Sequence, residues 1–78
     1  MKELLFTIVA GLVDDAEAIE ITQDEPNEEG TVVFHLRVAD DDMGRVIGKQ
    51  GRIAKAIRSI MRSAAPKYHM DSVAVEIG

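Results

Sequence analysis

Two glycines that enclose two polar residues, Gly48-Lys49-Gln50-Gly51, lie in the middle of this 78-residue chain. A run with helical spacing follows, so the loop is expected at a helix N-terminus, where backbone N–H groups lack partners within the helix and carry the positive end of its dipole. Such groups can donate to a phosphate, and the missing glycine side chains let a sugar-phosphate backbone come close. Lys49 would add a mobile cation. A lone glycine spacing of this kind is weak evidence, so its context decides.

Charge is divided unevenly along the sequence. The net charge is −5, but residues 1–36 contain one basic and nine acidic side chains, whereas residues 43–70 contain seven basic and no acidic ones. The seven are Arg45, Lys49, Arg52, Lys55, Arg58, Arg62 and Lys67. Such a segment attracts phosphate even within an acidic protein. It could instead be a solvated helix face whose cations pair with the acidic half, and charge alone leaves both interpretations open.

Apolar residues at helical spacing predict three helices, at residues 2–13, 43–47 and 52–65. The stripe of the first helix consists of Leu5, Ile8, Val9 and Leu12. The aspartates at 40–42 offer side-chain acceptors to cap the second helix, and Gly48 would end it in a left-handed conformation. The apolar arc of the third helix includes Ala54, Ile57, Ile60 and Met61. A metal site at the three aspartates is a weaker alternative, because capping and solvation explain them.

Alternating apolar and polar residues predict three strands, within residues 17–22, 31–39 and 72–77. The segment at 24–30 contains only turn-forming and charged residues and is expected to be a loop. The helical crossover between the last two strands is long enough to make them parallel. The expected fold class is α+β, in the order helix-strand-strand-helix-helix-strand, with a three-stranded mixed sheet and the helices packed on one face.

The segment GRVIGKQGRIAKAIRSIM, residues 44–61, resembles the signature of the K-homology (KH) domain, whose apolar-Ile-Gly-basic-x-Gly centre corresponds to residues 46–51. The order of the expected elements is that of a type II KH domain, the arrangement usual in bacteria. It covers the whole chain, so residues 1–78 are expected to form a single KH domain with its GxxG loop at 48–51. At this length the chain is similar to the small stand-alone bacterial KH proteins of the KhpA type.

The resemblance implies a site for single-stranded RNA, because the GxxG loop of KH domains clamps the backbone of about four unpaired nucleotides. The implied RNA-binding residues are Arg45, Ile47, Gly48, Lys49, Gln50, Gly51, Arg52 and Lys55. Ile47 and Ile53 would line the floor of the groove or support it. The strand at 32–38 and the loop at 24–30 would form the opposite wall. Four of the seven residues in that loop are acidic, so we expect it to repel phosphate and weaken binding.

The resemblance also implies function and partners. KhpA-type proteins are described as dimerising and as pairing with KhpB (also called Jag), and they are linked to RNA-chaperone activity, post-transcriptional regulation and control of cell elongation and envelope growth. The expected working unit is therefore a homodimer or a mixed pair with a KhpB-type partner. The alternative is a KH-fold protein-interaction module with little RNA binding, whose contact patch would include Ala54, Met61, Val33 and Tyr68. The implied contacts do not test for a 2′-hydroxyl group, so they do not distinguish RNA from single-stranded DNA.

Composition excludes several other classes. The absence of cysteine removes disulfides and thiolate chemistry, and only three aromatic residues are present, too few for base stacking as the main binding mode. No nucleophile with a base and no paired carboxylates are visible, so we expect no enzyme and no cofactor. No apolar run approaches the ~20 residues of a membrane span. The acidic residues near the N-terminus disfavour a signal peptide, so a cytoplasmic protein with no membrane contact is expected.

Overall fold

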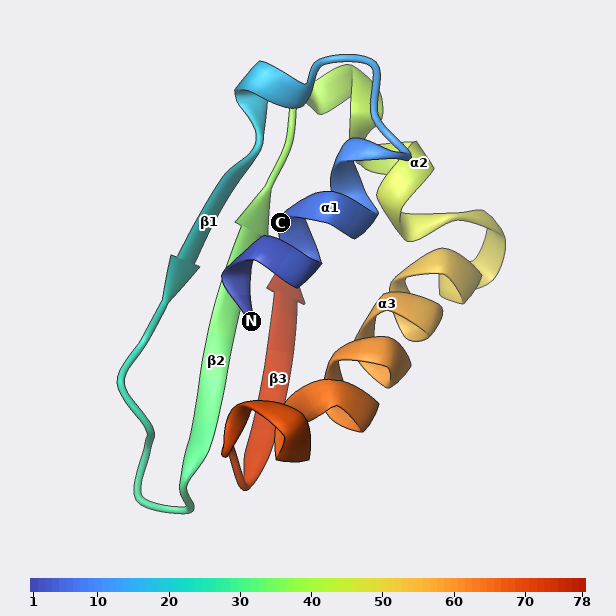
Figure 1. Ribbon diagram of the computed structural model, residues 1–78. Coiled ribbons are helices and arrows are strands. Elements are labelled where there is room, and N and C mark those ends of the chain that lie inside the picture. Colours follow the sequence, from blue (N-terminus) through green and yellow to red (C-terminus); the bar gives the residue numbers. More distant parts are fainter.

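The structure, a computed structural model, describes residues 1–78 as a three-stranded sheet with helices on one of its faces (Figure 1). The elements are α1 (Lys2–Ala10), β1 (Glu20–Gln23), β2 (Thr31–Arg37), α2 (Met43–Ile47), α3 (Arg52–Ala64) and β3 (Ser72–Ile77). Short 3₁₀ turns lie at Ala16–Ala18, Asp40–Asp42, Lys49–Gly51 and Ala65–Tyr68. The order and the mixed α+β class confirm the sequence-based prediction.

The sheet is mixed, with the strands in the order β1-β2-β3. β1 pairs with β2 in antiparallel fashion, with Ile21 opposite Leu36. β2 pairs with β3 in parallel, with Val32 opposite Val73. A parallel pair needs a long crossover, and the segment containing α2 and α3 supplies it. β2 is therefore the central strand, and β1 and β3 are the two edges.

The core lies between the sheet and the helices because each strand turns alternate side chains to that side. From β2 these are Val32, Phe34 and Leu36, from β3 Val73 and Val75, from α1 Leu5 and Val9, and from α3 Ala54, Ile57 and Met61. Phe34 is fully buried at the centre of this cluster. This shared core holds the helices against the sheet and sets the orientation of α3 relative to it.

The first helix ends at Ala10, three residues before the expected end. Gly11 lowers helix propensity at this point, and the N–H groups of Leu12 and Val13 both donate to the carbonyl of Val9 at 2.9 and 3.2 Å, in a turn. Leu12 and Val13 still pack against the core. The apolar stripe was predicted correctly, although its last member is not helical. No helix has both the length and the apolar character needed to cross a membrane.

The burial of three residues in α3 differs from the prediction. Ala54 and Met61, expected at the edge of the apolar arc and in a contact patch, are buried. Ile60, expected inside, leaves 46% of its surface exposed. The reason is geometric: the sheet contacts the side of the helix centred near Ala54, Ile57 and Met61, and Ile60 lies about 100° away from Met61 on the helical wheel.

Candidate nucleic-acid interface

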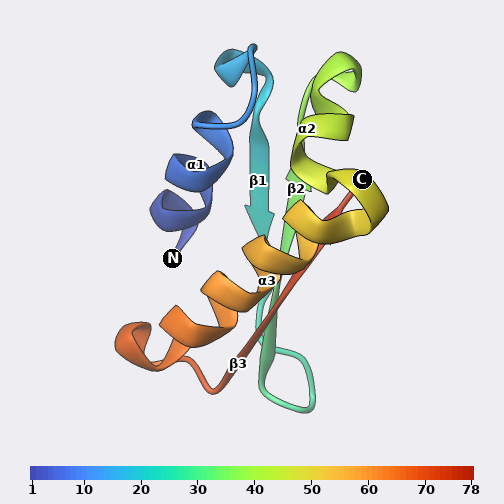
Figure 2. The same ribbon diagram turned by 90° about the vertical axis from the view of Figure 1, so that its right-hand side faces the viewer.

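The chain makes a sharp turn between α2 and α3, and this turn is the GxxG loop (Figure 2). Three of its residues have positive φ: Gly48 (φ 75°, ψ 174°), Gln50 (φ 57°, ψ 25°) and Gly51 (φ 74°, ψ 16°). The conformation of Gly48 is open essentially to glycine alone, and it differs from the left-handed helical one that was expected. Gln50 adopts a left-handed conformation that costs a non-glycine residue about 1–2 kcal/mol. Strained backbone of this kind often marks functional sites.

The two side chains at the tip of the loop point to solvent. Lys49 and Gln50 are exposed, as is Arg52 at the start of α3. Two backbone donors are already used within the loop: the N–H of Gly51 donates to the carbonyl of Gly48 at 3.2 Å, and the N–H of Arg52 donates to that of Lys49. A phosphate at this loop would therefore contact side-chain cations and the remaining backbone N–H groups. The expectation that all N–H groups at the start of this helix are free is corrected.

The apolar residues that flank the loop have different environments. Ile47, predicted as groove floor, leaves 37% of its surface exposed, and Val46 beside it is fully buried. Ile53 packs against the core from the first turn of α3 and fills the space next to Gly48. Ile53 thus supports the loop, and Ile47 is accessible to a base.

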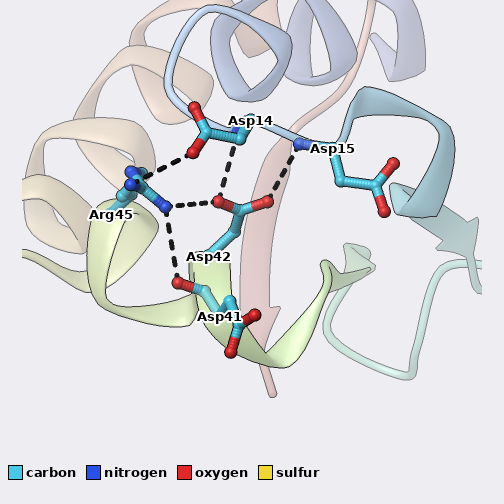
Figure 3. Close-up of polar contacts among 5 residues, drawn as sticks. All are labelled: Asp14, Asp15, Asp41, Asp42 and Arg45. Atoms are coloured by element: carbon cyan, nitrogen blue, oxygen red, sulfur yellow. Dashed lines mark hydrogen bonds and ion pairs between the residues drawn. The ribbon is translucent and has the colours of Figure 1, made fainter.

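Arg45, in α2, is held in ion pairs with two aspartates (Figure 3). Its guanidinium donates from Nη1 to Oδ1 of Asp42 at 2.6 Å, and its Nη2 lies 3.2 Å from Oδ2 of Asp14. Arg45 was predicted as an auxiliary phosphate contact. Its two acidic partners would compete with a phosphate, so among the predicted contacts it is the one least available.

Asp42 is the single buried charged residue, with 2% of its surface exposed. Its carboxylate accepts the backbone N–H groups of Asp14 and Asp15 at 3.2 and 3.1 Å, in addition to the bond from Arg45 (Figure 3). These backbone donors, followed by the Arg45 guanidinium, lower the pKa of Asp42 below its usual value. The carboxylate therefore ties α2 to the segment that follows α1.

This arrangement corrects one prediction and reveals one missed residue. The aspartates at 40–42 make no side-chain cap on the second helix, because the carboxylate of Asp42 points to the segment after α1. No group of three or more His, Cys, Asp or Glu side chains could hold a metal ion. From the sequence, Asp42 was expected to be solvated or to act as a cap. The i, i+3 spacing of Asp42 and Arg45 was a local signal for their ion pair. No local signal indicated that the backbone N–H groups of Asp14 and Asp15 would bind the Asp42 carboxylate.

The other six basic side chains of the segment 43–70 form no ion pair. The ion pairs of the protein involve Arg45, His35 and the N-terminal amino group as cations. Lys49, Arg52, Lys55, Arg58, Arg62 and Lys67 are all exposed. The alternative interpretation expected a solvated face whose cations pair with the acidic half. These six side chains are solvated but unpaired, so only Arg45 fits the expected pairing, and the other six remain available to anions.

The two segments expected to form the opposite wall of the groove are the central strand of the sheet and a loop at one of its ends. β2 is hydrogen-bonded on both sides, and the loop at 24–30 lies at the end of the sheet opposite the GxxG loop (Figure 1). The strand beside α3 is the edge strand β3: Nε of Arg58 donates to the carbonyl of Val75 at 3.1 Å.

A helix pair joined by a GxxG loop and packed on a three-stranded mixed sheet defines the KH class of fold. Two solved structures share it: Era in complex with MgGDPNP and nucleotides 1506–1542 of 16S ribosomal RNA (TM-score 0.67), and a variant of Aquifex aeolicus Era bound to GDP.AlF4− (TM-score 0.65). In each case identity is 18% and the match covers 96% of this chain but 28% of the Era chain. The likeness to Era therefore concerns the fold alone.

The family follows from closer matches. The family model described as KhpA/KhpB, KH domain matches residues 2–77. The RNA-binding protein KhpA of Clostridium acetobutylicum is 48% identical over 77 residues, which is 99% of both chains. That of Oceanobacillus iheyensis is 57% identical over 61 residues, 78% of this chain and 79% of the relative. The chain belongs to the KhpA/KhpB KH-domain family. This family is not enzymatic, in agreement with the sequence-based prediction.

Proposed function

We propose that this chain is a single-domain RNA-binding protein that clamps the backbone of single-stranded RNA at its GxxG loop. Gly48, Lys49, Gln50 and Gly51 form the clamp, with Arg52 and Lys55 as further phosphate contacts and Ile47 exposed toward a base. The observation that carries the proposal is the set of exposed cations without ion-pair partners around a loop with positive φ at both glycines. The names of the KhpA relatives support the same class of ligand.

The proposal extends to how the protein acts. One loop that holds about four nucleotides through their backbone binds weakly and with little sequence information. Pairing with a second KH domain would raise the overall affinity through avidity. We therefore include a homodimer, or a pair with a KhpB-type partner, acting in the cytoplasm as an RNA chaperone or post-transcriptional regulator that influences cell elongation and envelope growth. The family model covers the KH domains of both KhpA and KhpB, so a KhpB-type partner would supply a second KH domain of the same kind.

A direct test is the binding of a short fluorescent single-stranded RNA to the wild type and to the double variant Lys49→Asp, Gln50→Asp. The wild type should bind with an affinity that falls as salt increases, because cations on RNA are released on binding. The variant should lose this binding while its circular dichroism spectrum is unchanged. A matched control is Lys2→Asp, Gln23→Asp, which makes the same two chemical changes at exposed positions on other elements and should bind as the wild type does.

A second candidate function is protein association alone. Ile60 and Tyr68 each leave 46% of their surface exposed, and together with Leu4 they line an open groove of about 500 Å³ between α1 and the C-terminal end of α3. Exposed apolar side chains that lie together often mark an interface. Binding of RNA by neither the wild type nor the control, combined with dimers in sedimentation that Ile60→Asp separates, would favour this candidate over the first.

A further inference from the structure

The sheet has two edges, and only one of them is covered by a side chain. At β3 the carbonyl of Val75 accepts a hydrogen bond from Nε of Arg58, which reaches over from α3. At β1 the only neighbouring strand is β2, and Figure 1 shows no element on the other side. Natural sheets protect open edges with lysine, proline or a bulge. β1, with the sequence Glu-Ile-Thr-Gln, is short but contains neither lysine nor proline, so its edge is open to pairing.

The outward backbone groups of β1 belong to Ile21 and Gln23. The N–H of Asp24 donates to the carbonyl of Val33 in β2 at 3.0 Å. In an antiparallel pair every second residue bonds to the partner strand, so Thr22 also turns its backbone groups to β2. Ile21 and Gln23 turn theirs away from β2, and these groups have no hydrogen-bond partner in the chain. An extended peptide along this edge would bond to both residues.

An apolar groove lies beside this edge on the helix side of the sheet. It has a volume of about 330 Å³ and is lined by Lys2, Glu3, Phe6, Ile19 and Ile21. Phe6 leaves 44% of its surface exposed, and the two isoleucines are half-buried. A strand added to β1 would present alternate side chains to this side of the sheet. Apolar side chains at those positions would fill the groove.

The surface around β1 is acidic. Glu17 precedes the strand, Glu20 is its first residue and Glu25 follows it. All three are exposed and none is in an ion pair. The nearby cations are Lys2 in the groove and Arg37, which is opposite Glu20 in β2. Carboxylates without partners attract lysine and arginine and repel nucleic acid, so the charge favours a basic protein segment.

We propose that the free edge of β1 binds an extended peptide segment of a partner protein, in which apolar residues alternate with lysine or arginine. The backbone of the segment pairs with Ile21 and Gln23, as in other sheets extended by a peptide strand. Its apolar side chains enter the groove beside Phe6, and its cations face the acidic surface. In Figure 1 β1 and the turn between α2 and α3 lie on opposite sides of the molecule, so the inference goes beyond the proposed RNA binding.

A second copy of this chain fits the edge less well. Another β1 would bring the same acidic residues to the interface. In the antiparallel register centred on Thr22, Glu20 of one copy would be opposite Asp24 of the other. Like charges directly opposite each other destabilise a sheet. The basic partner segment avoids this repulsion.

The probe is a fluorescent peptide of about seven residues, close to the usual strand length, in which lysine and valine alternate. A peptide of the same composition with its lysines and valines grouped controls for charge alone. A third peptide alternates glutamate and valine. Fluorescence anisotropy should show the alternating basic peptide bound several-fold more tightly than the grouped one, and the acidic peptide should not bind. Equal affinity for the two basic peptides would overturn the proposal.

Two variants test the edge and the groove. Gln23→Pro removes an outward N–H, and proline is tolerated on an edge strand where its nitrogen faces solvent. It should weaken the alternating peptide several-fold, whereas Gln23→Ala, which keeps the N–H, should change little. Phe6→Ala removes one wall of the groove and should also weaken this peptide. Circular dichroism checks that each variant is folded. Unchanged affinity in folded Gln23→Pro would overturn the pairing with β1.

Hydrogen exchange in the wild type locates the peptide without any substitution. The amides of Ile21 and Gln23 have no partner in the free chain, so the alternating peptide should slow their exchange. Absence of this protection would contradict strand addition at β1. Sedimentation of the protein without peptide examines the other occupant. A dimer that Gln23→Pro separates would show that a second copy takes the edge, and the partner segment proposed here would be wrong.

Discussion

The Cγ1 atom of Ile53 lies 2.6 Å from the position that a Cβ atom on Gly48 would occupy. Real Cβ atoms essentially never show contacts this short, and Cβ and Cδ1 of Ile53 lie at 3.0 Å from the same position, so Ile53 or the loop would have to shift. Gly48 is thus required both for its positive φ and for the space that Ile53 fills. The glycine at this position keeps the loop tight against α3.

We predict that Gly48→Ala destabilises the protein by about 2–5 kcal/mol, the sum of backbone strain and overpacking. Gly51→Ala should cost less, about 1–2 kcal/mol, because its added Cβ would lie in open space although φ is also positive. Urea unfolding followed by circular dichroism measures both. The double variant Gly48→Ala, Ile53→Ala should lose less stability than the sum of the two single losses, because the shorter side chain at 53 makes room for the added Cβ. Purely additive losses would show that the steric account is wrong.

The carboxylate of Asp42 should make stability fall in acid. Its pKa is lowered in the folded protein, first by the N–H of Asp14 and next by that of Asp15. A lowered folded pKa contributes stability above the unfolded value of about 3.8, and this stability is lost as the pH falls through the folded pKa. Asp42→Asn should therefore lower the melting temperature at neutral pH and have a smaller effect in acid.

Asp41→Asn is the matched control for Asp42, because Asp41 is exposed and its carboxylate makes no hydrogen bond or ion pair. Thermal unfolding of the three proteins across the acid range measures the effect. A difference between Asp42→Asn and wild type that stays constant with pH would mean that packing, and not the ionised carboxylate, explains the loss.

His35 should titrate above its ordinary value. Its Nε2 lies 2.8 Å from Oδ2 of Asp24 and its Nδ1 lies 3.1 Å from Oε2 of Glu76, and the hydrogen bond with Asp24 is the largest cause of its raised pKa. A raised folded pKa contributes stability below the unfolded value of 6.5, and this stability is lost as the pH rises through the folded pKa. The charged ring bridges two strands and a loop on the uncovered face of the sheet.

An NMR titration of the His35 imidazole resonances measures this pKa. Asp24→Asn should lower the pKa of His35 more than Glu76→Gln does. A pKa of His35 at or below 6.5 in the wild type would show that the two carboxylates do not hold the ring in solution.

The strands and the glycine loop were predictable because their signals are local. Alternation along residues 31–37 identified the inward side chains, such as Phe34, and the two glycines located the turn between the helices. The role of Asp42 was not predictable, because its backbone partners are 27 and 28 residues away. The order of strands in the sheet was equally non-local, so the sequence did not show that β2 is the central strand and β3 the edge strand beside α3. Exposure of Ile60 depends on which side of α3 the sheet contacts.

Arg45 and Arg52 should respond in opposite ways to the loss of their charge. Arg45 is paired with Asp42 and Asp14, so Arg45→Gln should lower the melting temperature and leave the salt dependence of RNA binding nearly unchanged. Arg52 has no ion pair, so Arg52→Gln should leave stability within about 0.5 kcal/mol of wild type and reduce the salt slope by about 0.7. Thermal unfolding and RNA titrations at several salt concentrations separate the two. A reduced salt slope for Arg45→Gln would mean that RNA displaces the aspartates, and Arg45 would then belong to the clamp.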